Sequence, residues 1–292
     1  MTEKILSGKV AIITGANQGL GREISKSFVT AGANVMLCAR NYGLLEEVEQ
    51  ELKPLLSDNQ KIFIKKCDVT DDKQVNELVI ETFDKLGGCQ ILVNNAGIYG
   101  PKGAIEDQDW NEWKKTFDIN VYGSVLICRT LVPHFKKKHY GKIIQLSGGG
   151  ATKPLPNFSA YAASKAAIVR FAETLAEEVR NFDIDINSIA PGALNTNMLQ
   201  EVLDSGPEIV GKEFFENALK QKNDGGIPLN KGANLVVFLA SSASDGITGK
   251  LISALWDKWE YWPEHLDELR NSDAYTLRRI AGRDRGFDWG DV

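Results

Sequence analysis

The stretch KVAIITGANQGLG, residues 9–21, decides the fold of this 292-residue chain. Its first half is a short apolar run typical of a buried strand, and its second half is rich in glycine. Gly15 permits a tight turn after the strand, while Gly19 and Gly21 permit a pyrophosphate to approach the backbone closely. A helix that begins near Leu20 would add free amides and a positive dipole. The stretch therefore predicts a dinucleotide site, and a glycine turn without a ligand is the alternative.

Strand and helix patterns then alternate along the chain. Short apolar runs predict further strands at residues 34–40, 61–68, 90–95, 142–147, 183–190 and 250–254. Helical periodicity predicts helices at about residues 20–30, 44–56, 71–86, 107–138 and 160–179. This order predicts an α/β fold, a doubly wound, seven-stranded parallel sheet with helices on both faces. Ligands of such sheets bind beyond the carboxyl ends of the strands.

The composition argues against several classes of function. A formal net charge of −5 gives no basic footprint for nucleic acid. No apolar run approaches the roughly 18 residues of a membrane span, and we find no signal-peptide pattern. The cysteines and histidines show no metal-ligand spacing; they are Cys38, Cys67, Cys89, Cys128, His134, His139 and His265. We therefore expect a cytoplasmic protein with reduced thiols and without a metal, membrane or nucleic-acid partner.

Tyr161 and Lys165 form the most informative polar pair. They are four residues apart in a small-residue, helix-favouring run, so they would lie on one helix face, one turn apart. A free phenol has a pKa of about 10 and exchanges protons poorly at neutral pH. A cation one turn away favours the phenolate and brings the phenol pKa nearer to the working range. The same spacing also occurs on ordinary helix surfaces, which is the alternative for this pair.

With the motifs around this pair, the chain resembles the short-chain dehydrogenase/reductase family, in its single-domain Rossmann branch. The resemblance covers about residues 7–251. Its motifs follow the family's order: the glycine loop after Thr14, Asp68, Asn94-Asn95-Ala96-Gly97, Asn120, Tyr161-x-x-x-Lys165 and Pro191-Gly192. The resemblance implies a nicotinamide cofactor and hydride transfer to or from a carbonyl or alcohol carbon.

The resemblance also implies which residues bind the cofactor. They are Gly15, Asn17, Gln18, Gly19, Leu20, Gly21, Asp68, Val69, Asn95, Ala96, Gly97, Tyr161, Lys165, Pro191, Gly192, Leu194 and Thr196. Asp68 and Val69 would touch the adenine, and residues 95–97 would lie under the adenosine ribose. Residues 191–196 would meet the nicotinamide amide and the phosphates. A helix cap for Asp68 and a plain turn for Pro191-Gly192 are the alternatives.

Three catalytic roles follow from the same resemblance. Tyr161 would donate a proton to the carbonyl oxygen as hydride arrives at the carbon. Lys165 would hydrogen-bond the nicotinamide ribose and polarise Tyr161. Asn120 would hold a water behind Lys165, and an ordinary polar residue inside a helix is its alternative.

The choice of dinucleotide depends on the end of the second strand. An acid there would bind both ribose hydroxyls and repel a 2′-phosphate. This chain has Arg40 instead, and a guanidinium can grip a 2′-phosphate through a forked, charge-assisted contact. We therefore expect NADP(H) rather than NAD(H), with an ordinary surface arginine as the alternative.

One departure from the family lies thirteen residues before Tyr161. The family usually has a serine there that hydrogen-bonds the substrate oxygen, and this chain has Gly148. Ser147 is the candidate replacement, although adjacent strand residues point to opposite faces. Ser159 and Asn157 are further candidate donors. Losing such a donor without replacement would slow the reaction by a factor of ~10²–10³.

Two segments lie outside the core pattern. Residues 196–230 contain several glycines and short helical pieces, and we expect them to form a mobile segment over the substrate. Residues 252–292 form an extension rich in tryptophan and arginine, beyond a catalytic domain at residues 1–251. Trp256, Trp259 and Trp262 recur every three residues and could share a helix face. The extension either packs on the body or a neighbouring subunit, or lines the substrate pocket.

Together these features predict an NADP(H)-dependent oxidoreductase that interconverts a ketone and a secondary alcohol. The tryptophans and arginines favour a polar, sugar-like small-molecule substrate. Reduction of a 3-oxoacyl thioester or another lipid-like ketone is one alternative. A regulatory protein that binds NADP(H) without catalysis is another, because Gly148 replaces the serine. By analogy with the family we expect a homodimer or homotetramer.

Overall fold

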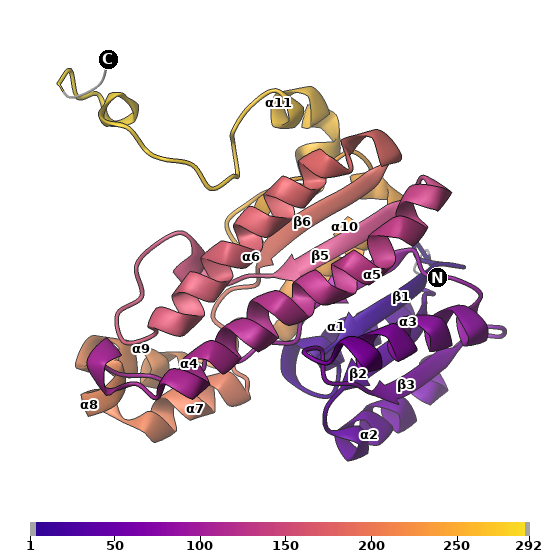
Figure 1. The fold of residues 1–292 in the computed structure, drawn as a ribbon, viewed down its shortest axis with the longest axis horizontal. Coiled ribbons are helices and arrows are strands. Elements are labelled where there is room, and N and C mark those ends of the chain that lie inside the picture. The colour runs from indigo at the N-terminus through magenta and orange to yellow at the C-terminus, as the bar shows by residue number, and fades with distance from the viewer. Residues whose placement is uncertain (1–3, 290–292) are drawn as a thin grey trace.

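Seven parallel strands form the central sheet, in the order β3-β2-β1-β4-β5-β6-β7 (Figure 1). The computed structural model describes residues 4–289. The strands are β1 Val10–Thr14, β2 Asn34–Ala39, β3 Ile62–Lys66, β4 Ile91–Asn94, β5 Gly141–Leu146, β6 Ile184–Ala190 and β7 Leu251–Ser253. Strands β1 to β3 run outward in one direction, and β4 returns to the other side of β1. The strand order therefore reverses between β1 and β4, where sheets of this kind bind ligands.

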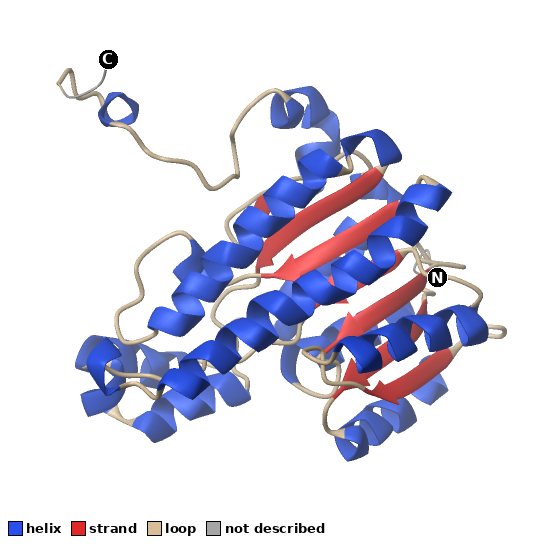
Figure 2. Cartoon of the chain, in the orientation of Figure 1, coloured by secondary structure: helices blue, strands red, loops and turns tan. Residues whose placement is uncertain are grey.

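Helices cover both faces of the sheet (Figure 2). They are α1 Gly19–Thr30, α2 Tyr42–Leu52, α3 Asp72–Leu86, α4 Trp110–Phe117, α5 Gly123–Lys138, α6 Ser159–Glu178, α7 Asn197–Ser205, α8 Pro207–Val210, α9 Lys212–Asn223, α10 Leu229–Ala240 and α11 Leu266–Arg270. Helices α1, α2 and α10 pack on one face, and α3, α5 and α6 pack on the other. The predicted doubly wound α/β fold is confirmed.

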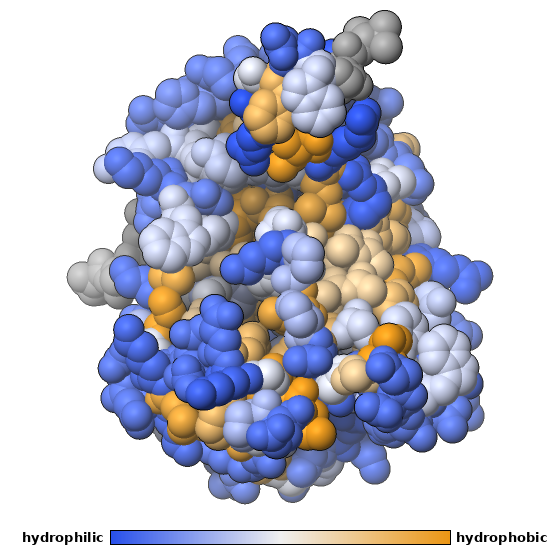
Figure 3. All heavy atoms as spheres, turned by 90° about the vertical axis from the view of Figure 1, so that its left-hand side faces the viewer, coloured by the Kyte–Doolittle hydropathy of each residue, from blue (hydrophilic) through white to orange (hydrophobic). Residues whose placement is uncertain are grey.

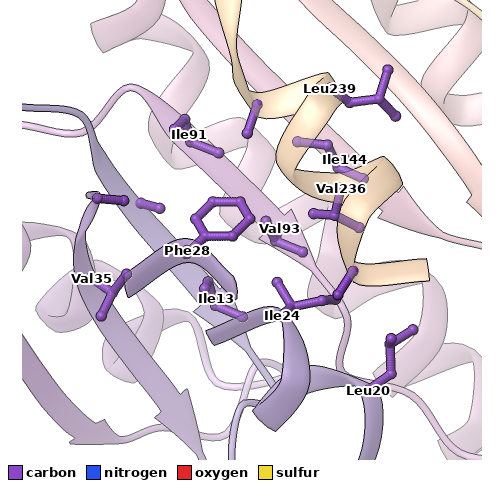
Figure 4. Packing of buried hydrophobic residues seen from close by; sticks show 14 of the residues in the cluster. Ile13, Leu20, Ile24, Phe28, Val35, Ile91, Val93, Ile144, Val236 and Leu239 are labelled. Carbon is purple, nitrogen blue, oxygen red and sulfur yellow. The ribbon is translucent and has the colours of Figure 1, made fainter. Parts of the chain in front are cut away.

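The strands supply both apolar layers because successive side chains point to opposite faces. Ile13 and Val93 face α1 and α10, where they meet Phe28 (Figure 4). Their neighbours Ile12 and Leu92 face the layer formed with α3, α5 and α6. Full burial of one such side chain contributes about 1.5–3 kcal/mol, so these two layers fix the strand ends that carry the site.

The helix limits differ from the sequence prediction in two places. Helix α2 begins earlier than predicted, because the Asn41 side chain accepts a hydrogen bond from the Leu44 amide and caps it. It ends at Leu52, and a 3-10 turn that contains Pro54 follows. The region predicted as one helix over 107–138 is divided into α4 and α5, which a π-helical turn at Asp118–Tyr122 joins.

The shared helix face predicted for three tryptophans is wrong for Trp256 and holds for Trp259 and Trp262, which are three residues apart in one 3-10 helix and pack on the same layer. Trp256 lies in a turn and is 85% exposed, while Trp259 and Trp262 belong to a 3-10 helix at Trp259–His265. The Asp257 carboxylate accepts a hydrogen bond from the Ser253 amide, which fixes the turn before that helix. Trp262 is buried in the α1/α10 layer and Trp259 packs on α10. The boundary predicted between residues 1–251 and the extension remains a prediction.

Candidate active site

The glycine loop is tied to the end of β4 by side-chain hydrogen bonds. The Thr14 hydroxyl accepts hydrogen bonds from the Asn95 and Ala96 amides, each at 3.0 Å. The Asn95 side chain donates to the carbonyl oxygens of Thr14 and Gly15. A Cβ on Gly21 would clash with that Gly15 oxygen, so the first turn of α1 packs against the loop only because residue 21 is glycine. These contacts hold the loop at the switch point of the sheet.

This loop fits the pyrophosphate of a nicotinamide dinucleotide. The N-cap of α1, Gln18, makes no side-chain cap, and the first turn of the helix carries no acid. Its amides are therefore free to donate to an anion. Gly19 has φ +53°, and a Cβ there would lie 3.3 Å from the Thr196 side chain. Asn197 at the start of α7 donates to the Gln18 side chain at 2.8 Å, so α7 begins directly beside the loop.

The residues predicted to hold the adenosine lie at the ends of β2 and β3. Arg40 follows β2 directly, is exposed, and has no hydrogen bond or ion pair within the described part of the chain. Asp68 accepts hydrogen bonds from the Thr70 amide and hydroxyl. The cap of α3 comes from Asp71, which accepts from the Gln74 amide, so Asp68 is not the helix cap.

The segment after β6 runs over the loop. It contains Pro191, Gly192, Leu194 and Thr196, which the resemblance assigns to the cofactor. Gly192 has φ +94°, and a Cβ there would lie 2.7 Å from the Leu255 side chain. Leu194 forms a parallel bridge with Ile227, which anchors the segment of α7 to α9 at both ends.

Tyr161 and Lys165 lie in the first turns of α6, beside the end of β5. Lys165 Nζ donates to the Leu146 carbonyl oxygen at 2.7 Å and lies 5.6 Å from the centre of the Tyr161 ring. Both side chains are buried. The predicted shared face of this pair is therefore present, and it points to the carboxyl ends of the strands.

The protonation of the pair differs from the prediction. Burial raises the pKa of Tyr161 well above its usual value, with a smaller contribution from Tyr99, and Lys165 is not among the causes. Burial also lowers the pKa of Lys165 to about 8. The net lowering of the phenol pKa that the sequence predicted is absent, because removal from water dominates both groups. Tyr161 is therefore protonated at neutral pH and able to donate.

Asn120 lies in the π-helical turn and reaches the same point. Its side chain accepts from the Ile98 amide and donates to the Ile98 carbonyl oxygen and to the Ser164 hydroxyl, each at 2.9 Å. A Cβ on Gly97 would lie 3.2 Å from Asn120 Oδ1 and 3.5 Å from Lys165 Nζ. The side-chain amide of Asn120 and the ammonium of Lys165 thus both lie beside Gly97, after the end of β4. π-helical turns occur frequently at functional sites.

Gly148 lies directly under the Tyr161 hydroxyl. An ideal Cβ at this position would be 2.5 Å from that hydroxyl oxygen. The backbone of Gly148 is extended and open to any residue, so the obstacle to a larger residue here is the Tyr161 hydroxyl, which would have to move. Ser147 is not brought to Tyr161. Its hydroxyl is buried and donates to the Lys165 carbonyl oxygen at 3.5 Å, because neighbouring residues point to opposite sides.

The other candidate donors are also directed elsewhere. The Ser159 hydroxyl donates to Gln108 and accepts from the Trp113 ring nitrogen. The side chain of Asn157 lies beside Gly211, where an added Cβ would be 3.2 Å from Asn157 Nδ2. The structure therefore brings together Tyr161 and Gly148 without a serine between them.

Tyr99 is the site residue that the sequence analysis missed. Its ring centre lies 4.6 Å from that of Tyr161 and 5.4 Å from that of Phe158. Burial, followed by the Glu201 carboxylate, raises the pKa of Tyr99. Its position two residues after the Asn-Asn-Ala-Gly motif, at the end of β4, was the available signal.

Apolar side chains from α7 and α9 complete the surroundings of Tyr161. The cluster comprises the buried Phe158, Tyr161, Leu199, Val202, Val210 and Ala218, with Tyr99, Leu155, Met198, Leu203, Phe214 and Phe215 packed against it. Figure 3 looks onto the side of the molecule that carries these helices, where apolar residues in orange lie among hydrophilic ones in blue. The wall beside the reactive phenol is thus mainly apolar.

Within residues 4–289, no group of three or more histidine, cysteine or acidic side chains has a geometry that could hold a metal ion. The same part of the chain contains no helix with the length and apolar character that a membrane span requires. The site consists of a glycine loop, a phenol, an ammonium, an amide and an apolar wall.

Comparison with known sequences matches residues 9–206 to a family described as short chain dehydrogenase. The 7alpha-hydroxysteroid dehydrogenase of Escherichia coli strain K12 is 32% identical over 248 residues, which cover 85% of this chain and 93% of that protein. The 2,3-dihydro-2,3-dihydroxybenzoate dehydrogenase of Bacillus subtilis strain 168 is 31% identical over 256 residues, covering 85% and 95%.

Solved structures show the same fold. A levodione reductase superposes with a TM-score of 0.78 at 24% identity, covering 89% of this chain and 99% of that one. An actinorhodin polyketide ketoreductase solved with NADPH gives 0.76 at 24% identity, covering 84% and 95%. An NAD+-bound xylitol dehydrogenase gives 0.77 at 25% identity, covering 85% and 98%. Structures with this fold thus include complexes with either dinucleotide.

Proposed function

This chain belongs to the short-chain dehydrogenase family, and we propose that it interconverts a bulky, largely apolar ketone and the corresponding secondary alcohol with NADP(H). The family binds a nicotinamide cofactor and acts on alcohols and ketones, so the proposal concerns the dinucleotide, the substrate and the residues that do the chemistry. One observation carries it. A protonated phenol, Tyr161, lies between a buried ammonium and an apolar wall at the carboxyl edge of the sheet.

Tyr161 acts as the proton donor for reduction. The bound cofactor supplies the hydride that goes to the carbonyl carbon. The Tyr161 hydroxyl gives its proton to the carbonyl oxygen, and proton transfer by a positioned group contributes typically ~10²–10⁴-fold to a rate. The Lys165 ammonium, 5.6 Å from the ring centre, stabilises the phenolate that remains. In the reverse direction the phenolate accepts the proton of the alcohol.

Asn120 and Gly148 position these groups. Asn120 holds the backbone of Ile98 and faces Lys165 across Gly97, where the resemblance puts a relay water. Gly148 leaves the space that the Tyr161 hydroxyl takes. Ser147 has no part in this proposal, because its hydroxyl donates to the Lys165 carbonyl oxygen.

Arg40 supports NADP(H) over NAD(H). It follows β2, is exposed, and no acidic partner occupies its guanidinium within the described residues. A forked arginine contact to a 2′-phosphate is charge-assisted and therefore roughly twice as strong as a neutral hydrogen bond. An acid at this point would instead favour the free ribose hydroxyls of NAD(H).

The apolar wall supports a bulky, ring-bearing or lipid-like substrate in place of the sugar expected from the sequence. The sugar expectation depended on tryptophans beside the reactive phenol. Trp262 lies in the α1/α10 layer and Trp256 is outside the cluster around Tyr161. The half-buried side chains of that cluster are apolar, and they include Leu155, Met198 and Phe214. An apolar ring buries well against such side chains, and a sugar would leave its hydroxyls unpaired. The name of the bacterial hydroxysteroid relative agrees with this class.

Two further parts of the proposal concern assembly and location. We propose a homodimer or homotetramer, supported by the exposed aromatic residues Trp110 and Tyr122 beside a groove on α4. We propose a cytoplasmic location, supported by four cysteines that are all buried and free.

The test is oxidation of NADPH, compared with NADH, in the presence of a panel of ketones. The panel contains bulky cyclic and steroid-like ketones, a 3-oxoacyl thioester and keto-sugars. The proposal expects the highest kcat/KM with NADPH and the bulky apolar ketones. Preference for a keto-sugar would contradict the substrate class. NADPH binding without turnover of any ketone would identify a regulatory protein instead.

A further inference from the structure

Lys102, in the loop between β4 and α4, has a side chain that the protein mostly covers. The side chain is 12% exposed, and its ion pair with Glu201 on α7 spans 3.7 Å. Within residues 4–289 its ammonium donates no hydrogen bond to the protein, and Nζ is not one of the fully buried atoms that lack a partner. The ammonium therefore reaches water and keeps its donors available for a ligand.

The buried lysines of the described residues donate their ammonium hydrogens to oxygen atoms of the protein. Lys142 donates to Asp185 at 2.6 Å and also pairs with Asp245. Lys250 donates to two backbone carbonyl oxygens, and Lys165 donates to one. Lys102 therefore differs from them, because its ammonium reaches solvent and no protein oxygen within residues 4–289 accepts its donors at hydrogen-bond distance.

The position of Lys102 connects it to the reactive phenol. Its Nζ lies 5.8 Å from the centre of the Tyr99 ring, and that ring lies 4.6 Å from the Tyr161 ring. One aromatic side chain thus separates the ammonium from the proton donor. A substrate whose carbonyl meets Tyr161 would extend along Tyr99 and present its far end to Lys102.

We propose that Lys102 binds a carboxylate at the far end of the substrate, so that the preferred substrate is a bulky ketone acid. This inference rests on the proposed oxidoreductase function and names its substrate class. The half-buried apolar side chains of the cluster around Tyr161, such as Leu155, Met198 and Phe214, would contact the body of the molecule. A carboxylate offers Lys102 the short, charge-assisted contact that the protein itself does not supply.

The substrate carboxylate would take the position beside Lys102 that the Glu201 carboxylate has in the structure. It is 53% exposed and lies on α7, within the segment over the site. A substrate carboxylate would displace it from Lys102, and Glu201 would remain in water at little cost because exposed ion pairs are weak.

The experiment compares ketone acids with their neutral esters. NADPH oxidation is measured with two pairs, 4-acetylbenzoate and its methyl ester, and 4-oxocyclohexanecarboxylate and its methyl ester. For wild type, kcat/KM of each acid should exceed that of its ester by ~10–100-fold, the range of one charge-assisted contact. In Lys102→Met this ratio should fall to about 1, through a loss of kcat/KM for the acids. Lys102→Arg keeps the charge and should keep the preference for the acid.

Lys114→Met is the matched control. Lys114 is an exposed lysine on α4 that lies 6.0 Å from the Trp110 ring centre, a similar contact away from the site. It should retain the acid preference of wild type. Glu201→Gln removes the competing carboxylate and should raise kcat/KM of the acids while leaving the esters unchanged.

The outcomes separate this inference from the proposed function. Equal kcat/KM for acid and ester in wild type would overturn the role of Lys102 and leave the ketone reductase intact. An acid preference that survives in Lys102→Met would overturn it as well. No NADPH oxidation with any ketone of either kind would overturn the proposed function itself.

Discussion

Restoring the family's serine at Gly148 should inactivate this protein. In the resembling family a serine at this position helps catalysis, so sequence comparison alone would expect Gly148→Ser to improve the rate. The structure predicts the opposite, because the Tyr161 hydroxyl occupies the space of the missing side chain.

The expected size of the effect follows from one distance. A Cβ at residue 148 would lie 2.5 Å from the Tyr161 hydroxyl oxygen, whereas carbon–oxygen contacts in proteins are normally at least about 3.3 Å. The hydroxyl must therefore move by about 1 Å. A misplacement of about 1 Å in a reacting group can cost ~10²-fold in rate. We expect kcat to fall ~10²-fold in both Gly148→Ser and Gly148→Ala.

The assay is steady-state NADPH oxidation with the best ketone of the panel, together with NADPH affinity measured by fluorescence. Cofactor affinity should change by less than about 3-fold, because Gly148 is away from the glycine loop. Gly149→Ala is the control, since a Cβ at Gly149 would have no atom within 4 Å. A Gly148→Ser protein as active as wild type would refute the steric argument, and a serine variant much faster than the alanine variant would show that a donor can still act there.

Four other outcomes are expected. Arg40→Asp should shift the NADPH/NADH ratio of kcat/KM by ~10²-fold or more toward NADH, because it replaces a cation beside the 2′-phosphate with an anion. An unchanged ratio would contradict the contact between Arg40 and the phosphate. The kcat/KM for NADPH should fall as the pH rises above about 8. Burial lowers the pKa of Lys165 to about 8, so in the free enzyme this lysine is charged below that pH and neutral above it. A flat profile from pH 7 to 10 would count against a charged Lys165. Asn120→Ala should lower kcat by ~10-fold or more. The rate of hydrogen exchange at the Ile98 amide should rise in the same variant, because that amide donates a hydrogen bond to Asn120. An unchanged kcat would show that Asn120 has no role in the mechanism. Trp262→Ala should lower the free energy of unfolding by about 3–5 kcal/mol, because the Trp262 side chain is 5% exposed. Trp256→Ala should change this free energy little, because Trp256 is 85% exposed. Equal effects of the two variants in urea titrations would contradict this packing.

The sheet could be predicted from the sequence because each strand is a short apolar run that ends in a polar or glycine-rich motif. Such runs are buried on both faces in a parallel sheet, so the pattern and the fold depend on the same property. The pairing of Tyr161 with Lys165 could also be predicted from the sequence, because helix periodicity places them on one face. Asn120 could be placed near them because the strand ends bring its segment to the same edge of the sheet.

The remaining features depend on contacts between distant segments. Gly148 looked like a lost donor, and only its contact with Tyr161 shows why glycine is required. Burial, which spacing does not reveal, reversed the expected effect on the Tyr161 pKa. Tyr99 and Lys102 belong to no motif, and only the fold brings Tyr99 beside Tyr161 and Lys102 beside Glu201. The three-residue spacing of the tryptophans indicated one helix face, and the 3-10 helix keeps Trp259 and Trp262 on it, while the turn fixed by Asp257 leaves Trp256 outside.

The central claim is that Tyr161 donates the proton in ketone reduction with NADPH. The most direct measurement is single-turnover oxidation of bound NADPH by saturating ketone in wild type and in Tyr161→Phe, which removes one oxygen and keeps the buried ring. We predict that the rate of this step falls by ~10³-fold or more while NADPH affinity stays within about 2-fold of wild type. A Tyr161→Phe protein that reduces the ketone within about 10-fold of the wild-type rate would contradict the account.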